Sequence, residues 1–269
     1  MERHEASSVF PFQRLSAAEL RDDVLGQLQS YRIEASETLM DVARRFDLGF
    51  VELRAANLDV EVWRLEVGTV VRLPTAHILP KAPRQGIVVN LSEMRLYYFS
   101  AKDRAQKTYP LGVGRQGRLT PIVLPGPFNP LGRHALYFGW HQFLIHGTNK
   151  PDGVGRRVSA GCLRMYPEDA AELFELVPIG TPMTVVDQPV KVGKNASEFF
   201  LEVHPNPQQA DEIEFEGQLT PAMPPGLVRI VLEGVGEEDH RLDWEAIREA
   251  GLKRLGVPVQ ITRTADLAD

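Results

Sequence analysis

The sequence predicts an α+β protein, mostly β, built from three parts. In residues 31–75, strand and helix patterns follow in the order strand, helix, helix, strand, which is typical of a small compact unit. Residues 85–188 repeat β-rich segments separated by glycine and proline, which predicts a mostly β domain. Residues 189–269 show a strand, a polar proline-rich stretch, a helix near 243–254 and a last strand, which predicts a small accessory α+β subdomain.

Residues 1–30 form a polar lead with one short helical pattern, SAAELRDDVLGQL. The first residues, MERHEASSVFPF, lack the charged-then-apolar order of a secretion signal. A hydrophobic content of 43%, a charged content of 25% and a net charge of -6 are ordinary for a soluble globular protein. No basic stripe indicates binding to nucleic acid, and no stretch approaches the roughly 18 apolar residues of a membrane span.

In the 31–75 unit, the stretch YRIE alternates like a strand, and the next stretch predicts a helix with one apolar face. That face contains Leu39, Val42, Ala43 and Phe46. Thr38 stands where its hydroxyl can cap this helix. A second helix, FVELRAAN, is expected to stop at Asn57, and TVVRLP is typical of a closing strand.

The central domain is expected to follow a proline-containing linker, ILPKAPRQG. Its strand candidates are GIVVNLSEMRLYYFS, which holds two runs joined by a polar turn, QKTYPLGVG, HALYFGWHQFLIHG and TPMTVVD. The stretch PEDAAELFELV predicts one helix, with Pro167 at its first position and acidic residues at its positive end.

Two patterns resemble ligand sites but do not meet their requirements. The motif GVGRQG (112–117) is a formal G-x-G-x-x-G, but the prolines that follow exclude the helix that a dinucleotide site needs. A turn that leaves a strand is expected there instead. The histidines His134, His141 and His146 lie close in sequence, but their spacing matches no zinc motif, so no metal site is predicted.

Cys162, the one cysteine of the chain, is the candidate nucleophile. Without context, a lone cysteine is most often a small buried apolar residue. The small residues before it, Ser159, Ala160 and Gly161, let a substrate approach the backbone and make amide N–H groups available to an oxyanion. His146 ends the apolar run FLI sixteen residues upstream and opens a glycine-rich loop, so it is the best base for generating the thiolate.

The stretch from Tyr31 to Pro74 resembles a LysM domain, a family that binds N-acetylglucosamine-containing glycans such as peptidoglycan. The matching residues are Tyr31, Glu37-Thr38-Leu39 at the first helix start, Ala56-Asn57 at the second helix end, and Leu65 and Gly68 before the last strand. The resemblance implies a glycan-binding βααβ domain over 31–75. An unrelated small α+β module is the alternative.

The stretch from Ile145 to Asp187 is similar to the catalytic segment of L,D-transpeptidases of the YkuD type. His146-Gly147 and Ser159-x-Gly161-Cys162-Leu163-Arg164 match the signature of that family. The resemblance implies a β-sandwich-like catalytic domain with its site in a cleft. It also implies a reaction on a peptidoglycan tetrapeptide, in which cysteine takes the acyl group of the third residue, D-alanine leaves, and an amine receives the acyl group.

By the same resemblance, Cys162 is the nucleophile, His146 is its general base, and the carbonyl of Gly147 orients the imidazole. The backbone N–H groups of Gly161 and Cys162 would form the oxyanion hole. The substrate-binding candidates are Arg164, Ser159, Ala160 and Thr148. Arg164 would hold a substrate carboxylate or order the loop, with an ordinary packing arginine as the alternative, and Ser159 would shape the turn. No cofactor and no metal are implied, because thiolate, imidazole and oxyanion donors suffice.

The order of the three parts is similar to the ErfK/YbiS/YcfS/YnhG group of periplasmic enzymes, over residues 31–263. Some members attach an outer-membrane lipoprotein to peptidoglycan through its C-terminal lysine, and others crosslink diaminopimelate residues. The resemblance implies peptidoglycan glycan and stem peptides as partners, with an outer-membrane lipoprotein as a further acyl acceptor. It also implies a periplasmic location, so the natural protein is expected to be exported.

Besides the missing secretion signal, the sequence departs from the family at two places. Ala160 stands where many relatives have histidine, so a polar contact to substrate would be lost. The segment after Thr120-Pro121 is shorter than in relatives, and a more open cleft would favour hydrolysis of the acyl-enzyme over aminolysis. The alternatives to a transpeptidase are an L,D-carboxypeptidase, with water as acceptor, and a peptidoglycan-binding protein without catalytic activity.

Overall fold

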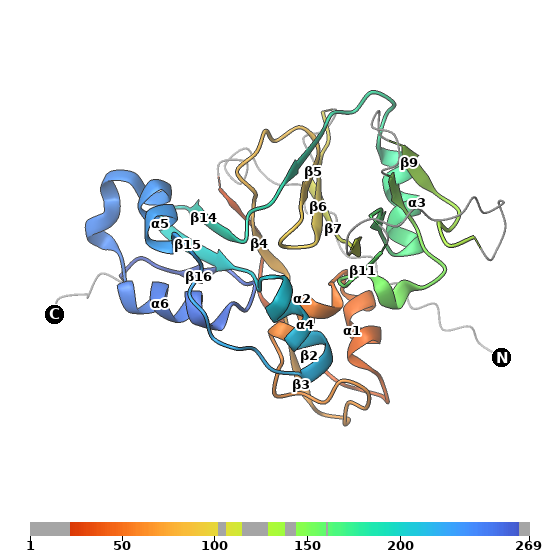
Figure 1. Cartoon of the computed structure of the whole chain (residues 1–269), viewed down its shortest axis with the longest axis horizontal. Coiled ribbons are helices and arrows are strands. Elements are labelled where there is room, and N and C mark those ends of the chain that lie inside the picture. Colours follow the sequence, from red (N-terminus) through yellow and green to blue (C-terminus); the bar gives the residue numbers. More distant parts are fainter. Residues whose placement is uncertain (1–21, 102–105, 115–128, 138–143, 160, 264–269) are drawn as a thin grey trace.

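The computed structural model shows a mixed α+β protein in which sheets predominate (Figure 1). It describes residues 22–101, 106–114, 129–137, 144–159 and 161–263. Within these ranges no helix has both the length and the apolar composition needed to cross a membrane. The segment after Thr120-Pro121, His141 and Ala160 lie outside the described residues.

The first unit is an antiparallel strand pair with two helices between its strands in sequence. The pair is β2 (Gln29–Arg32) with β3 (Val70–Leu73), and the helices are α1 (Leu39–Arg45) and α2 (Phe50–Ala55). The predicted cap of α1 is confirmed, because Thr38 Oγ1 accepts the Asp41 N–H at 3.2 Å and the Asp41 carboxylate accepts the Thr38 N–H at 2.8 Å. The predicted apolar face packs into the core of this unit.

The helical pattern expected in the lead is wrong where the structure describes it. Val24–Gly26 forms a strand, β1, which pairs antiparallel with β4 (Ala76–Ile78). All three residues of β4 are buried, so pairing with this strand outweighs the local helix propensity of the lead. The predicted linker therefore starts in a buried strand.

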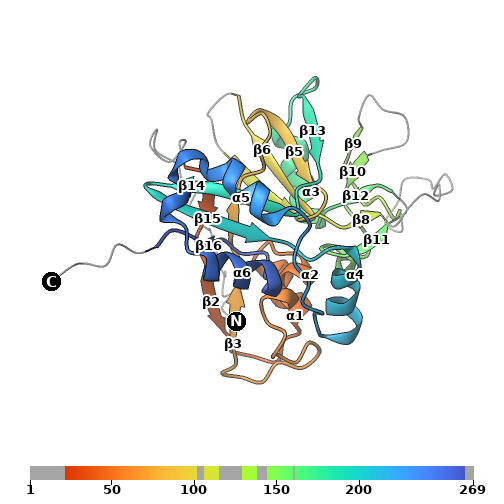
Figure 2. The same cartoon turned by 60° about the vertical axis from the view of Figure 1, so that its left-hand side comes forward.

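The central domain contains two main sheets, with strand orders β13-β5-β6-β7 and β12-β10-β9 (Figure 2). The strands are β5 (Gly86–Asn90), β6 (Arg95–Phe99), β7 (Gln106–Pro110), β9 (Ala135–Tyr137), β10 (Leu144–His146), β12 (Leu163–Arg164) and β13 (Met183–Val186). A short parallel pair joins β8 (Val113–Gly114) to β11 (Arg157–Ser159), with the 3₁₀ turn η2 (Pro151–Gly153) before β11. The predicted helix is confirmed as α3 (Pro167–Leu176), and its Ala170 and Leu173 share one core with both sheets.

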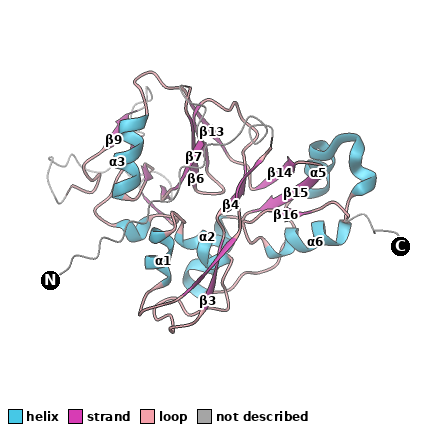
Figure 3. Cartoon of the chain, turned by 180° about the vertical axis from the view of Figure 1, so that it is seen from behind, coloured by secondary structure: helices cyan, strands magenta, loops and turns pink. Residues whose placement is uncertain are grey.

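The C-terminal part is a three-stranded antiparallel sheet, and α5 and α6 pack with it in one hydrophobic core (Figure 3). Its elements are β14 (Val190–Asn195), β15 (Glu198–Val203), α4 (Pro207–Asp211), the π-helical turn η3 (Glu212–Glu216), α5 (Leu227–Val235), η4 (Gly236–Arg241), α6 (Trp244–Lys253) and β16 (Val259–Gln260). The predicted helix near 243–254 is confirmed as α6. The helices α4 and α5 and the strand β14 were not predicted.

Helix α2 belongs to two cores at once. Leu53 packs into the core of the first unit, whereas Phe50, Val51 and Ala55 pack into the core of the central domain. A helix that is apolar on more than one side is buried on more than one side. The first unit is therefore docked on the central domain through α2.

Asp169, in the first turn of α3, is a buried carboxyl group with an unusual pKa. It is 6% exposed, and its Oδ2 has no hydrogen-bond partner among the described residues. Burial raises the pKa of Asp169 to about 8, and the charges of Asp47, Glu168 and Glu172 add to the rise. The pKa in the unfolded chain is about 3.9, so the folded protein binds more protons between about pH 4 and pH 8 and loses stability as pH rises through that window.

The substitution Asp169→Asn is expected to remove this pH dependence, because the amide resembles the protonated carboxyl group. The difference in Tm between variant and wild type should grow from near zero at about pH 4 to several degrees at about pH 8, in favour of the variant. Thermal unfolding at several pH values measures this. A difference that stays the same at every pH would contradict the assignment.

Candidate active site

Strands β10 and β12 bring the two predicted catalytic positions together. They pair in parallel, with Ile145 opposite Leu163 and His146 opposite Arg164. Ile145 and Leu163 lie in the central core, and side chains alternate along a strand, so His146 and Arg164 face the other way. Cys162 comes directly before β12 and two residues before Arg164. Residues two apart in extended chain point to the same side, so Cys162 is on the side of Arg164 and of its neighbour His146.

His146 is fixed by backbone contacts on each side. Its Nδ1 hydrogen-bonds the carbonyl of Gly147. Its own carbonyl accepts the Met165 N–H at 2.9 Å, and the Gly147 N–H donates to the carbonyl of His134 at 3.0 Å. A neutral imidazole that donates through Nδ1 keeps its lone pair on Nε2. The backbone therefore selects the tautomer in which Nε2 can act as a base.

The protonation state of His146 also suits a base. Burial is the largest effect and lowers the pKa of His146 below its ordinary value, and the charge of Arg164 lowers it further. The bond to the Gly147 carbonyl raises the pKa but does not reverse the shift. At neutral pH the imidazole is therefore neutral and can accept a proton. This favours a Cys–His pair that starts as thiol and imidazole over one that starts as an ion pair.

The residue before the half-buried Cys162 must be glycine. Gly161 has a φ of 120°, a conformation that L side chains rarely adopt. The backbone turn into Cys162 thus explains one of the predicted site residues. Ser159 closes β11, and Ala160 lies outside the described residues. Donation by the Gly161 and Cys162 N–H groups to an oxyanion stays a prediction.

Arg164 presents its charge beside His146. Its Nε has no hydrogen-bond partner within the described part of the chain. Its backbone exchanges two hydrogen bonds with Gly112, at 2.8 and 2.9 Å. A Cβ at Gly112 would lie 2.3 Å from the carbonyl oxygen of Gly153, so this glycine of the GVGRQG motif serves close backbone packing. That agrees with the structural role expected for the motif.

Thr148 has a contact within the loop that follows His146. It is 4% exposed, and its Oγ1 accepts the Lys150 N–H at 3.0 Å. This bond shapes the loop. The predicted contact between Thr148 and substrate stays a prediction.

Comparison with known proteins identifies the family. Residues 84–191 match the YkuD L,D-transpeptidase catalytic domain. The chain is 34% identical to the probable L,D-transpeptidase YbiS of Escherichia coli K12, over 88% of each chain. It is 33% identical to the probable L,D-transpeptidase ErfK/SrfK of Salmonella typhimurium, over 84% of this chain and 83% of that protein. The chain belongs to the YkuD family of L,D-transpeptidases.

Within this family the similarity extends beyond the catalytic domain. The putative L,D-transpeptidase YkuD of Bacillus licheniformis is 32% identical and covers 58% of this chain. The match to YbiS and ErfK/SrfK covers more than four-fifths of the chain, so it includes regions on both sides of the catalytic domain. The predicted membership in the ErfK/YbiS/YcfS group is confirmed.

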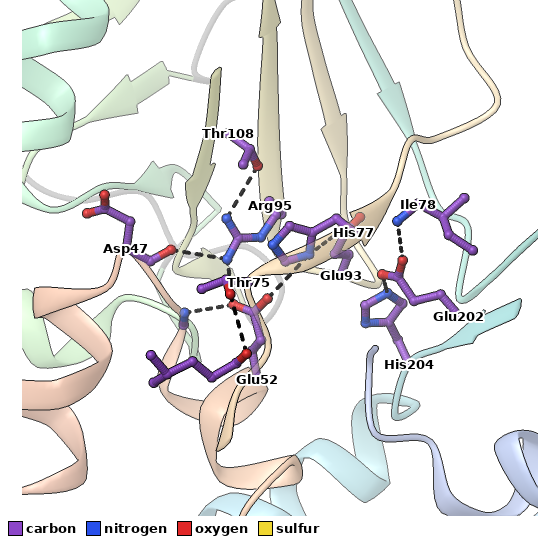
Figure 4. A network of polar contacts seen from close by, with 12 residues as sticks. Asp47, Glu52, Thr75, His77, Ile78, Glu93, Arg95, Thr108, Glu202 and His204 are labelled. Carbon is purple, nitrogen blue, oxygen red and sulfur yellow. Dashed lines mark hydrogen bonds and ion pairs between the residues drawn. The ribbon is translucent and has the colours of Figure 1, made fainter. Parts of the chain in front are cut away.

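Among the described residues of this transpeptidase, one group of side chains has the spacing of a metal site. The ligand atoms of His77, Glu93 and Glu202 lie within 4.8 Å of one another (Figure 4). However, the Lys191 Nζ lies 2.9 Å from carboxylate oxygens of both Glu93 and Glu202, and it also donates to the carbonyl of Ile78. The three N–H donors of the ammonium are thereby used, and it supplies the positive charge between the two carboxylates. This cluster is an internal ion-pair network.

The sequence reasoning missed the residues that hold the loop between His146 and Cys162. Gly155 of this loop packs against Gly49 of the first unit, and a side chain at either position would collide with the backbone of the other. In the sequence, PDGVG indicates only a glycine-rich loop, and Gly49 lies 106 positions away. One sequence contains no signal that pairs them.

Proposed function

We propose that this L,D-transpeptidase acts on peptidoglycan tetrapeptide stems through an acyl-enzyme on Cys162. The observation that carries the proposal is the neutral His146, with Nδ1 held by the Gly147 carbonyl, on the strand beside the Cys162 segment. His146 takes the thiol proton, the thiolate attacks the carbonyl of the third residue, and D-alanine leaves with the proton that His146 returns. An amine then attacks the thioester, forming a crosslink or attaching the lysine of a lipoprotein, and the thiol is restored.

The remaining site residues would bind the substrate and stabilise the oxyanion that forms during acylation. The N–H groups of Gly161 and Cys162 donate to the oxyanion, which Gly161 allows through its unusual φ. The guanidinium group of Arg164, whose charge acts on His146, would receive a carboxylate of the stem peptide. Ser159, Ala160 and Thr148 would line or shape the substrate path.

The first unit, over 31–75, would be a LysM domain that binds the glycan. Its βααβ order and the role of its motif residues support this. The Asn57 side chain donates to the carbonyls of Leu53 and Arg72 at 2.8 Å and accepts the Arg72 N–H at 2.8 Å, so it joins the end of α2 to β3. In this proposal, residues 85–188 form the catalytic domain, residues 189–269 an accessory subdomain, and the enzyme works in the periplasm.

An adduct on Cys162 tests the mechanism. After mixing with a disaccharide-tetrapeptide, intact-protein mass should rise by the substrate mass minus D-alanine, and Cys162→Ala should show no rise. Because the chain has one cysteine, no second thiol can take the acyl group. Turnover by Cys162→Ala would contradict the mechanism.

The released products distinguish the acceptors. Crosslinked peptide would support transpeptidation, whereas tripeptide alone would favour an L,D-carboxypeptidase. Binding to insoluble peptidoglycan without an adduct or turnover would favour a glycan-binding protein with a silent catalytic domain.

A further inference from the structure

The loop between His146 and Cys162 caps a helix of the first unit. The first N–H groups of an α-helix have no partner within the helix. In α2, the Phe50 N–H donates to the carbonyl of Val154 at 3.4 Å, and the Val51 N–H donates to the carbonyl of Gly155 at 3.1 Å. The N-cap residue, Gly49, has no side chain to do this. The loop carbonyls therefore take the place of an N-cap.

The other side of the same loop segment is bound to the catalytic domain. The Gly155 N–H donates to the carbonyl of Leu111 at 3.1 Å, and the Val113 N–H donates to the carbonyl of Arg156 at 3.0 Å. Gly112, which lies between Leu111 and Val113, exchanges two backbone hydrogen bonds with Arg164. Arg164 lies two positions after Cys162. The loop is thus clamped between α2 and the chain segment that borders β12.

The backbones of α2 and the loop lie so close together that a Cβ at Gly155 would have no space between them. A Cβ at Gly155 would lie 2.1 Å from the Phe50 nitrogen and 2.2 Å from the Gly49 Cα. Gly155 also has a φ of 74°, which favours glycine. A side chain at this position would force α2 and the loop apart.

Buried charge fixes α2 on the catalytic sheet. Glu52 Oε2 accepts the Gly49 N–H at 2.9 Å and the Arg95 Nη2 at 2.7 Å (Figure 4). Arg95, on β6, also donates to the carbonyl of Asp47 at 3.2 Å. The Arg95 and Glu52 side chains are 2% and 7% exposed. Helix α2 is therefore tied to β6 at the same end at which it holds the loop.

From these contacts we infer that α2 is part of the active site's support, and that Gly155 is a positioning residue for the Cys162 and His146 segments. The inference rests on the proposed function of these two residues. It gives the first unit a second role, separate from glycan binding. A substrate too short to reach a glycan site on the first unit should still depend on the α2–loop contact.

The test compares two glycine variants of the full chain. Gly155→Ala inserts a methyl group into the contact with α2. Gly180→Ala is the matched control, because its φ of 88° carries the same backbone strain but a Cβ there meets nothing within 4 Å. Gly155→Ala is expected to slow acylation by a soluble disaccharide-tetrapeptide at least about tenfold, since small displacements of reacting groups have large effects on rate. Gly180→Ala should stay within about twofold of wild type.

A second readout separates positioning from a general loss of structure. Alkylation of the single cysteine by iodoacetamide reports the thiolate at Cys162, and its pH profile depends on the neighbouring imidazole. This profile should shift in Gly155→Ala and match wild type in Gly180→Ala. Gly49→Ala, at an ordinary φ of -78° and with its Cβ 2.8 Å from the Gly155 Cα, pushes the same contact more gently and keeps the test open if Gly155→Ala does not fold.

The outcomes distinguish the inference from the proposed function. If wild type forms the adduct and Gly155→Ala and Gly49→Ala form it equally fast with unchanged alkylation profiles, the inference is wrong. Equal slowing by Gly180→Ala would also overturn it. If wild type forms no adduct and shows no turnover, the proposed function fails, and the alkylation profiles alone decide whether α2 positions the segment around Cys162.

Discussion

Replacement of His146 by glutamine is expected to slow acylation of Cys162 by about 10³-fold, which lies in the usual range for a lost general base. Glutamine can keep a hydrogen bond to the Gly147 carbonyl but has no basic nitrogen to replace Nε2. Wild-type kcat/KM should fall on the acid side as His146 becomes protonated. Burial and Arg164 lower the pKa of His146, so this fall should lie below about pH 6.5.

Release of D-alanine measured from pH 5 to 8 tests this expectation. The matched control is His134→Gln, because His134 accepts the Gly147 N–H with its backbone carbonyl, which the variant keeps, and its ring packs against Phe174 at 5.3 Å between centroids. That variant should keep both the rate and the acid limb. An acid limb that persists in His146→Gln would assign the titration to another group.

The two positions of the proposed catalytic pair could be singled out from the sequence because their signals are local. His146 follows an apolar strand, and Cys162 follows the glycine that its backbone turn needs. The same is true of α1 and α3, whose caps and apolar faces lie within one short stretch. Periodicity and capping describe such elements well, since the decisive contacts are a few residues apart.

Features that depend on distant contacts could not be predicted. The stretch FVELRAAN has apolar residues on more than one side, and only the fold shows that Leu53 and Phe50 serve different cores. Val24–Gly26 lies in a helical pattern but pairs with β4, which follows it by about 50 positions. Arg95 resembles an ordinary polar residue in a strand, yet its carboxylate partner lies 43 positions earlier. The burial of α2, the strand at Val24–Gly26 and the ion pair of Arg95 all depend on contacts between distant parts of the chain.

The Arg95–Glu52 pair is expected to give a large stability effect, because both side chains are almost fully buried. Removing one member of a buried pair leaves the other charge unpaired, which typically costs about 3–5 kcal/mol. Arg95→Met should therefore lower Tm by roughly 10 °C. The surface control is Arg229→Met, whose pair with Glu233 is exposed at both ends and should contribute little.

A double variant separates the charge effect from lost packing. Burial raises the pKa of Glu52, and Arg95 is the strongest opposing influence. In Arg95→Met the pKa of Glu52 should rise further, so stability should fall as pH rises from about 4.5 towards that pKa. The variant should be least destabilised near pH 5 and most near pH 8.

Adding Glu52→Gln to Arg95→Met should restore part of the lost stability at pH 8 and little at pH 5, because the neutral amide leaves no unpaired buried charge. Thermal unfolding of wild type, Arg95→Met, Glu52→Gln and the double variant at both pH values measures the coupling between the two residues. If Arg95→Met loses the same stability at pH 5 and at pH 8, then packing of the Arg95 side chain, and not its charge, holds α2 on β6.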